Sequence, residues 1–372
     1  MSWPDNRCLN REQNSMAALT QHPSSVAQKL QTLRGNRALR LLSDAEIRQQ
    51  LAGITVPKEA DAVFEGGGVK GIALAGAIQV AELLGVRWKS VAGTSAGAIA
   101  AALLAAGYSS RELVTILTRE MDFNKFMDEG IVDKLPLIGK LASALFEKGI
   151  YEGDYFESWL GQKLAQRGVH TFADLRDGQG GYRLKMIASD VTQRKMVVLP
   201  DQLPEYGRDP DSFPVARAAR MSMSIPYFFE PVMLDYPGAS GARCKAYIVD
   251  GGMLSNFPVW LFDAPAGTAP RWPTYGFKLV EPDSDRPAPE RWPHQYIMAL
   301  VNTMMEAHDR AYIEQANFKR TIAIPTMGIQ TTQFNLTDEE ETLLVRAGQE
   351  AAIKFFREWS FDRHNQTYRG TP

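Results

Sequence analysis

The chain has 372 residues and a formal net charge of −2, with 41 Lys and Arg against 43 Asp and Glu. Hydrophobic residues make up 45% of it and charged residues 23%, which is ordinary globular usage and excludes a wholly disordered chain. The balance of charges argues against a dedicated nucleic-acid-binding protein, because such proteins depend on an excess of positive charge. We therefore expect no nucleic-acid partner.

Cysteine and histidine are too sparse for a disulfide scaffold or a zinc site. The two cysteines, Cys8 and Cys244, cannot supply the Cys-x-x-Cys pairs of a structural zinc site. The five histidines show neither HxxxH nor HExxH spacing. We therefore expect no bound metal.

The first fifteen residues, MSWPDNRCLNREQNS, contain no basic stretch followed by an apolar one, so we expect no secretory signal. This predicts a cytoplasmic protein and leaves open export by a route that uses no signal peptide. The most apolar segment, residues 91–108, is rich in Ala and Gly, is barely long enough to cross a membrane and contains a turn motif. We interpret it as a buried strand, turn and helix.

The chain begins with a polar stretch, residues 1–55, that is rich in Gln, Asn and Arg. Within it, Ser43 and Glu46 have the spacing of a capping box, which predicts a short helix that stops near Gly53. We interpret the stretch as a loosely attached extension, partly helical or disordered.

Two strand–turn–helix units follow from residue 60 onward. Each has a short apolar strand, a glycine-rich turn and an apolar helix that stops at a glycine. Such repetition predicts an α/β fold with a mostly parallel central sheet and helices on both faces. The predicted elements are strands 60–65 and 90–92, turns 66–71 and 93–97, and helices 72–84 and 98–106.

The rest of the chain predicts further elements of both kinds. Residues 121–150 carry apolar side chains at helical spacing with lysines nearby. This is typical of a helix packed on the core, or of a lid or interfacial helix that touches anionic lipid. The other predicted elements are strands 184–189, 196–199, 247–249 and 275–280 and helices 292–315 and 338–359.

Gly93, Ser95 and Gly97 form the pattern G-x-S-x-G between a predicted strand and a predicted helix. A turn this sharp strains the serine, and a side chain at either glycine would collide with neighbouring backbone. The Ser95 hydroxyl would lie above the N-terminus of the next helix, whose dipole favours negative charge. The motif alone occurs by chance in roughly one chain in ten of this length, so its strand–turn–helix context is what makes Ser95 the candidate nucleophile.

The glycine-rich turn GGGVKG, residues 66–71, predicts an oxyanion hole. Consecutive glycines let backbone N–H groups converge on a point that no side chain blocks. The residues assigned to this turn are Gly66, Gly67 and Gly68 as the hole, with Lys70 as a nearby positive charge and Gly71 as the last glycine of the motif.

The same turn also satisfies the dinucleotide-binding fingerprint G-x-G-x-x-G. A Rossmann fold further requires an acidic residue about 20 positions on, at the end of a second strand. Residues 86–90, VRWKS, occupy that region and contain none. Dinucleotide binding is therefore the weaker alternative.

Asp250, Gly251 and Gly252 follow the apolar residues 247–249. An Asp at a strand end before two glycines predicts an exposed carboxylate on a tight turn. A serine nucleophile needs a base, and each histidine lies on a predicted helix, in a loop or in a polar terminal segment, so we assign Asp250 as the base for Ser95. The histidines are His22, His170, His294, His308 and His364.

In this order, the three motifs resemble the signatures of patatin-like phospholipases. The resemblance covers about residues 60 to 280, and the three ordered motifs together are highly specific. Four further stretches are similar to the family: 171–175 (TFADL), 188–192 (ASDVT), 216–226 (ARAARMSMSIP) and 229–231 (FEP).

The resemblance implies a patatin-like three-layer α/β fold and a serine lipid acyl hydrolase, such as a phospholipase A or a lysophospholipase-type esterase. It implies that Ser95 is the nucleophile, Asp250 the general base and the backbone of residues 66–68 the oxyanion hole. It also implies a phospholipid or other acyl ester as substrate, a peripheral membrane surface as partner, no metal in the chemical step and no cofactor.

On this basis the chain divides into an N-terminal extension (1–55), a catalytic domain (56–320) and a C-terminal helical segment and tail (321–372). Two variants of the activity stay open: a latent phospholipase that needs a protein or other activator, and an acyltransferase. Arg217 and Arg220 are assigned to salt bridges rather than to phosphate binding.

Overall fold

The computed structural model describes residues 40–121, 153–226, 228–238, 242–265, 268–280, 303, 319–329, 331, 333 and 336–368. All of the predicted lid or interfacial helix (121–150) except Met121, and all of the predicted helix 292–315 except Thr303, lie outside these residues. So do the first 39 residues of the predicted extension.

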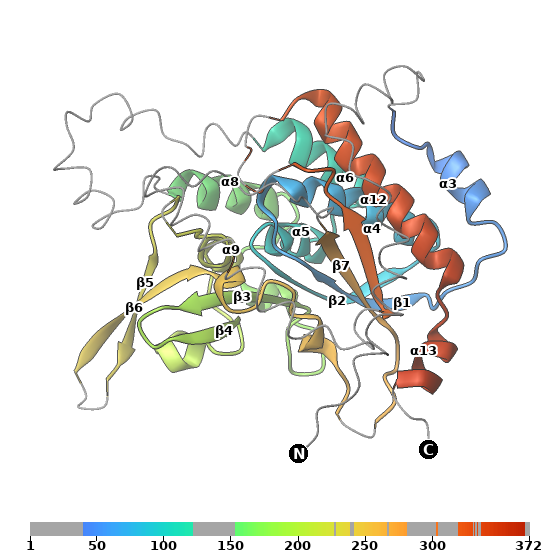
Figure 1. The fold of residues 1–372 in the computed structure, drawn as a ribbon. Helices are drawn as coiled ribbons and strands as arrows, with labels where there is room; N and C mark the ends of the chain where they lie inside the picture. Colours follow the sequence, from blue (N-terminus) through green and yellow to red (C-terminus); the bar gives the residue numbers. More distant parts are fainter. Residues whose placement is uncertain are drawn as a thin grey trace, which may run out of the picture.

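An eight-stranded mixed sheet forms the centre of the molecule (Figure 1). Strands β3, β2, β1, β7 and β8 run parallel to one another, while β4 and β6 pair antiparallel with β3, and β5 pairs antiparallel with β6. The strand order is β5-β6-β3-β2-β1-β7-β8, with β4 beside β3 off this path. The strands are β1 (Glu59–Phe64), β2 (Arg87–Thr94), β3 (Leu184–Asp190), β4 (Lys195–Leu199), β5 (Val232–Pro237), β6 (Arg243–Asp250), β7 (Thr274–Val280) and β8 (Thr321–Pro325).

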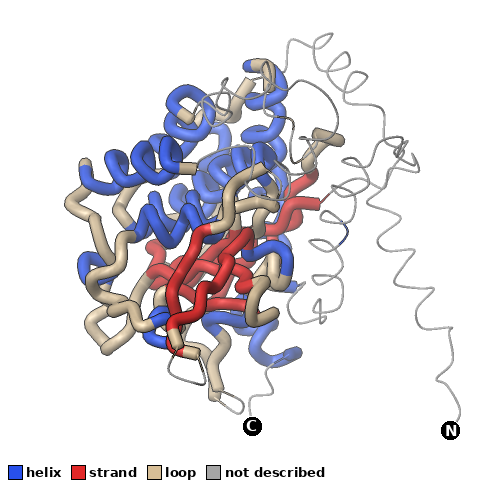
Figure 2. Tube along the Cα trace, turned by 90° about the vertical axis from the view of Figure 1, so that its left-hand side faces the viewer, coloured by secondary structure: helices blue, strands red, loops and turns tan. Residues whose placement is uncertain are grey.

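Helices flank the sheet, with the thicker layer on one side and short helical segments and loops on the other (Figure 2). Helix α5 contacts β1, β2 and β3, α9 contacts β3 and β6, and α4 and α12 cross each other beside β8. The α-helices are α3 (Asp44–Gln50), α4 (Ile72–Leu83), α5 (Ala96–Ala105), α6 (Ser110–Thr115), α8 (Asp154–Ala165), α9 (Val215–Ser222), α12 (Asp338–Glu358) and α13 (Phe361–Tyr368). The short helices used below are η1 (Gly68–Gly71), the π-helix η2 (Ile116–Glu120), η7 (Gly251–Met253) and η8 (Val259–Phe262).

Helix α5 shows why the core takes this form. Its sequence, AGAIAAALLA, is apolar on every side, and all of its residues from Gly97 onward are buried. A helix that is apolar all round needs neighbours on every side, and α5 has the sheet on one side and α4, α6, α8 and α9 around it. The unit β2–turn–α5 is therefore fixed at the centre of the fold.

The predicted α/β fold is confirmed, and so are the predicted strands and the helices at 72–84, 98–106 and 338–359, with boundaries that differ by a few residues. The antiparallel half of the sheet was not foreseen, because β5 (VMLDYP) carries Asp and Pro and reads poorly as a strand. Helix α9 and strand β8 were also missed.

The C-terminal segment is built into the same layers as the predicted catalytic domain. Strand β8 pairs with β7 from Thr321 to Pro325, and α12 lies across α4. The crossing depends on two glycines: a Cβ on Gly76 would clash with the Val345 carbonyl, and a Cβ on Gly348 would clash with the Ala73 carbonyl.

The part of the predicted extension that the structure describes is also attached to the core. Helix α3 begins at the predicted capping box, in which Ser43 and Glu46 cap each other. The buried side chain of Gln349 accepts from the Leu42 N–H at 2.9 Å, donates to the Leu42 carbonyl at 3.1 Å and donates to Gln79 at 2.8 Å. This buried amide network joins α3, α4 and α12.

We predict that Gly348→Ala destabilises the protein by roughly 1–3 kcal/mol, because the new methyl group meets backbone that a packed core cannot easily move. The matched control is Gly161→Ala in α8, where the nearest atom to the new Cβ is the Ala216 Cβ at 3.7 Å. There the better helix propensity of Ala should leave stability unchanged or raise it by up to about 1 kcal/mol. Urea unfolding measures both; an equal effect would show that α4 and α12 do not approach as described.

Candidate active site

The nucleophile turn joins β2 to α5. Ser95 has φ 53° and ψ −123°, a left-handed conformation that costs a non-glycine residue energy and is concentrated at functional sites. A Cβ on Gly93 would clash with the Gly97 carbonyl, and one on Gly97 would clash with the Phe64 carbonyl. The predicted need for glycine on both sides of the serine is thus explained by two close backbone approaches.

The Ser95 backbone is fixed from a distant part of the chain. Its N–H donates to Ser222 Oγ at 3.0 Å, and Ser222 Oγ in turn donates to the Ile187 carbonyl at 2.6 Å. Ser222 is the last residue of α9 and is fully buried. Its hydroxyl therefore links α9, β3 and the nucleophile turn.

The sheet register brings Asp250 to the same place. Thr94, just before the nucleophile, lies opposite Ile187, and Asp250 lies opposite the next residue of β3, Ala188. Strand β4 occupies one side of β3 at residues 186–190, so β2 and β6 both pair with the other side, β2 with residues 184–187 and β6 with residues 188–190. The carboxyl ends of β2 and β6 therefore meet end to end beside β3, which brings Ser95 and Asp250 together.

Asp250 is fully buried, so the prediction of an exposed carboxylate is wrong. The end of β6 pairs with β3, α9 packs against β6, and η7 packs against β3 and α9, so the strand end lies in the interior. The Asp250 N–H donates to the Ser224 carbonyl at 2.8 Å, and its Oδ1 accepts from the Gly252 N–H at 2.7 Å. A Cβ on Gly251 would clash with the Ile187 carbonyl, so the turn needs glycine there.

Burial raises the pKa of Asp250 to about 7, because the charged form is deprived of water, while the Ser95 hydroxyl and the Gly252 N–H lower it as hydrogen-bond donors. Among the described residues, Oδ2 has no partner with full hydrogen-bond geometry. The Ser95 hydroxyl thus lowers the pKa of the Asp250 carboxyl as a donor, but it forms no hydrogen bond of regular geometry with Oδ2. Such incomplete contacts are common in enzymes without substrate.

The glycine-rich turn lies beside Ser95. A Cβ on Gly66 would lie 3.1 Å from the Ser95 Cβ and would clash with Asn256 Oδ1. The Gly66 N–H already donates to the Asn256 carbonyl at 3.1 Å, so Gly66 cannot serve as an oxyanion donor. The N–H groups of Gly67 and Gly68 have no hydrogen-bond partner among the described residues.

The rest of the turn is held by its own chain. Gly68 has φ 54°, a Cβ there would clash with the Thr331 carbonyl, and the Val69 N–H donates to that same carbonyl at 3.2 Å. A Cβ on Gly71 would lie 2.9 Å from the Ala96 Cβ, so Gly71 allows α5 to approach. Lys70 is buried on η1.

An ion pair anchors the residue before the turn. Glu65 is buried; its carboxylate accepts from Lys278 Nζ at 2.6 Å and from the Leu279 N–H. Both partners are on β7, the neighbour of β1. The glycine turn is thereby fixed at the edge where β1 and β7 end.

Arg217 and Arg220 differ in their surroundings. Arg217 forms the predicted salt bridge, to Glu157 at 2.9 Å. Arg220 is buried without a carboxylate partner among the described residues; it donates to Ser224 Oγ and to the Glu230 carbonyl. Because Ser224 also accepts from the Asp250 N–H, Arg220 supports the loop that positions Asp250.

Sequence reasoning missed Asn256, Ser222, Ser224 and Glu65. Ser222 and Ser224 lie inside the stretch 216–226 that resembles the family, so that stretch already pointed to them. Glu65 precedes the glycine turn directly, and a charged residue at the end of a buried strand is a signal in itself. Asn256 had no local signal, because its partner Gly66 is 190 positions away.

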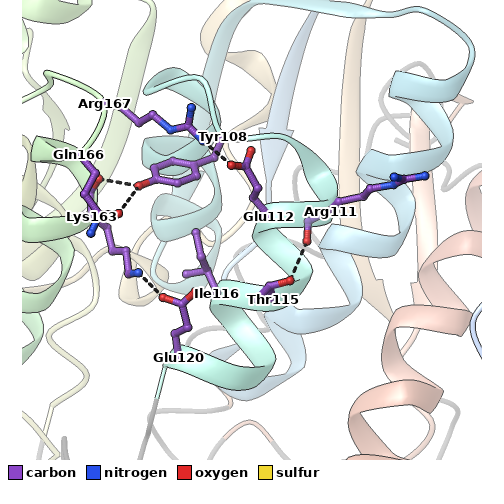
Figure 3. A pocket seen from close by; sticks show the side chains of 9 residues that line it. All are labelled: Tyr108, Arg111, Glu112, Thr115, Ile116, Glu120, Lys163, Gln166 and Arg167. Carbon is purple, nitrogen blue, oxygen red and sulfur yellow. Dashed lines mark hydrogen bonds and ion pairs between the residues drawn. The ribbon is translucent and has the colours of Figure 1, made fainter.

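A cavity of about 430 Å³ lies between α6, η2 and α8, away from this site (Figure 3). Tyr108 lines it just beyond the C-terminal end of α5, about 15 Å along that helix from Ser95. Each charged side chain that lines it has an ion-pair partner: Arg111 with Asp44, Arg167 with Glu112 and Lys163 with Glu120. The cavity therefore presents no free charge for a reaction.

The expectations about histidines, metal binding and membrane-spanning segments concern residues outside this site. Of the histidines, His170 is exposed after α8 and His364 lies on α13 near Trp359, while the other three are outside the described residues. Within the described part of the chain, no group of three or more His, Cys, Asp or Glu residues is placed to hold a metal ion. No helix in that part is both long and apolar enough to cross a membrane.

The chain is similar to several known proteins. The chain is 42% identical to YqhO of Bacillus subtilis over 303 residues, which cover 81% of this chain and 99% of YqhO. It is 25% identical to R571 of Acanthamoeba polyphaga mimivirus over 302 residues, 77% of this chain and 89% of R571.

VipD from Legionella pneumophila shares the fold, with a TM-score of 0.50 and 18% identity over 82% of this chain and 67% of VipD. The model of the patatin-like phospholipases matches residues 62–263, a range that contains the nucleophile turn, the glycine turn and Asp250. The chain therefore belongs to the patatin-like phospholipase family.

Proposed function

We propose that this protein is a serine hydrolase that cleaves fatty-acyl esters of phospholipids through an acyl-enzyme on Ser95, with Asp250 as the general base. Family membership supports a hydrolase that acts on lipid esters. The observation that supports the dyad is a serine in a strained turn beside a fully buried carboxylate, one oxygen of which has no hydrogen-bond partner within the described part of the chain.

In the first step, Asp250 takes the hydroxyl proton as Ser95 Oγ attacks the ester carbonyl carbon. The C–O bond to the glycerol oxygen then breaks, and the proton passes from Asp250 to that oxygen, which leaves as the lysolipid. A pKa near 7 suits this role, because a base works best when its pKa is close to the working pH. An ordinary Asp, with a pKa near 3.9, would be a far weaker base.

The negative charge that develops on the carbonyl oxygen would be held by the N–H groups of Gly67 and Gly68. Both groups lack a partner among the described residues, and Gly66 beside them touches the nucleophile. The N-terminus of α5, directly after Ser95, adds a favourable dipole. Each well-placed donor contributes roughly 3–4 kcal/mol to stabilising such a transition state.

In the second step, water attacks the acyl carbon while Asp250 takes one of its protons. The bond between the acyl carbon and Ser95 Oγ then breaks, the proton passes from Asp250 to Oγ, and the fatty acid leaves. An alcohol in place of water would give acyl transfer instead. A peripheral membrane surface and a protein activator stay as predictions from the resemblance. The dinucleotide alternative gains no support, since the turn is closed by Thr331 and lies against Ser95.

We predict that Ser95→Ala lowers fatty-acid release from mixed phospholipid vesicles at least 10³-fold, because no other group supplies the nucleophile. The matched control is Ser212→Ala, which removes an exposed hydroxyl in the loop before α9; it should keep wild-type activity. Mass spectrometry of the lyso products gives the rate and the position of cleavage. Equal activity of Ser95→Ala and wild type would refute the proposed nucleophile.

The pH profile tests the base. Asp250 must be ionised to accept a proton, and its pKa is raised to about 7. We therefore expect kcat/KM to rise about tenfold per pH unit below pH 7 and to level off above it. A profile that levels off near pH 4 would show that the carboxylate is not raised, and a substantial rate with Asp250→Asn would show that another group is the base.

The pH dependence of protein stability gives an independent test of the raised pKa of the buried Asp250 carboxyl. The pKa of Asp250 is higher in the folded state than the ordinary 3.8, so the folded state holds the proton more tightly than the unfolded state does. The free energy of unfolding therefore falls as the pH rises from about 4 to 7. Asp250→Asn cannot ionise. We expect it to be inactive, yet to gain stability relative to wild type between pH 5 and pH 8, by at most about 4 kcal/mol.

Urea unfolding at both pH values measures this gain. Changes in packing that Asn causes are the same at both pH values and cancel. A difference between variant and wild type that does not change with pH would contradict the raised pKa.

A further inference from the structure

Asn256 is a second polar side chain at the site that the dyad does not use. It lies between η7 and η8 and is 8% exposed. Its side-chain amide donates from Nδ2 to the Gly66 carbonyl at 3.1 Å. Its Oδ1 is buried and has no hydrogen-bond partner among the described residues.

The orientation of this amide follows from its partner. A carbonyl oxygen can only accept, so the NH₂ end must face Gly66 and the Oδ1 end must lie on the other side. A Cβ on Gly66 would clash with that Oδ1 and lie 3.1 Å from the Ser95 Cβ. The acceptor end of Asn256 and the nucleophile therefore border the same point.

Asn256 holds both polar groups of the Gly66 backbone. Its carbonyl accepts the Gly66 N–H at 3.1 Å, and its Nδ2 binds the Gly66 oxygen at the same distance. In a planar trans peptide, the carbonyl of one residue and the N–H of the next point in opposite directions. Fixing the Gly66 carbonyl toward Asn256 therefore directs the Gly67 N–H away from Asn256.

Such an anchor is needed because the turn is intrinsically free to move. Glycine at 66, 67 and 68 leaves the peptide planes with little steric restraint, and ordering such residues costs more conformational entropy than ordering any other residue type. Without the Nδ2 bond, the plane between Gly66 and Gly67 could rotate, and its N–H would lose its direction. An oxyanion donor works only when it is directed in advance.

We propose that Asn256 is the positioning residue that directs the Gly67 N–H at the developing oxyanion. This inference rests on the function proposed above and adds a residue to it. Asn256 acts through the Gly66–Gly67 peptide and does not itself touch the reacting carbonyl.

Asn256→Asp is the sharpest variant, because it keeps the shape and Oδ1 but replaces the donor with an acceptor. The control is Asn365→Asp on α13, where the amide oxygen is also buried and has no hydrogen-bond partner among the residues that the structure describes. If Asn256→Asp does not fold, Asn256→Ala removes the donor without adding charge. Thermal melting shows whether each variant is folded.

Two readouts separate positioning from general damage. The first is the split between kcat and KM for a soluble fatty-acyl ester. The second is inhibition by a fatty-acyl trifluoromethyl ketone, in which Ser95 Oγ bonds to the carbonyl carbon, the proton passes to Asp250 and the oxygen becomes an oxyanion. This adduct reports oxyanion stabilisation without a leaving group.

We expect kcat to fall 10- to 100-fold for Asn256→Asp with KM within threefold of wild type, and the ketone Ki to rise in parallel with the loss of kcat. Asn365→Asp should match wild type in all three. Wild-type kcat and Ki would overturn the inference. So would a loss of kcat that accompanies a lower melting temperature while Ki stays at the wild-type value.

Ser95→Ala, measured on the same ester, separates this outcome from failure of the proposed function. If Ser95→Ala is as active as wild type, the proposed function fails and the positioning role fails with it. If activity requires Ser95 and Asn256→Asp behaves as wild type, the positioning role alone is wrong.

Discussion

The exclusion of water from Asp250 is the constraint on which the rest of the site depends. A carboxylate in the interior is costly unless it is compensated, and here one backbone N–H and a nearby serine hydroxyl compensate it only in part. The remaining cost appears as a raised pKa, which converts a weak base into a useful one. The pairing of Asp250 with Ala188 of β3 and the hydrogen bond from its N–H to the Ser224 carbonyl hold it in the interior, so the chemistry of one residue is set by the topology around the end of β6.

Each reactive group is held by a contact from a distant part of the chain. Ser222 holds the N–H of Ser95, the carbonyl of Ser224 holds the N–H of Asp250, and Asn256 holds both backbone groups of Gly66. The strain at Ser95, of order 1–3 kcal/mol, persists only because such contacts over-determine the turn. Two of these three holding residues, Ser222 and Ser224, are two positions apart at the C-terminal end of α9, so one short segment holds the nucleophile and the base together.

Local patterns in the sequence predicted the first strands and helices of the sheet well, but they did not predict the contacts between residues that are far apart in the chain. Glycine turns between apolar runs predicted β1, α4, β2 and α5, because strand, turn and helix each leave a signal within a few residues. The burial of Asp250 and the occupied N–H of Gly66 could not be predicted, because they depend on partners 26 and 190 positions away. Strand β8 was missed for a similar reason: TIAIP is too short to be recognised without its neighbour β7.

The position of Ser95 depends on how closely α5 approaches the sheet. The glycines at 93 and 97 remove side chains where the helix start meets β1 and β2, and Gly71 does so where η1 meets Ala96. Alanines fill most of the rest of α5, which packs on three strands at once. A larger side chain anywhere along that interface would lift the helix from the sheet and carry Ser95 away from Asp250. The small residues of α5 therefore serve the dyad as directly as the turn itself does, although none of them beyond Gly97 belongs to a catalytic motif.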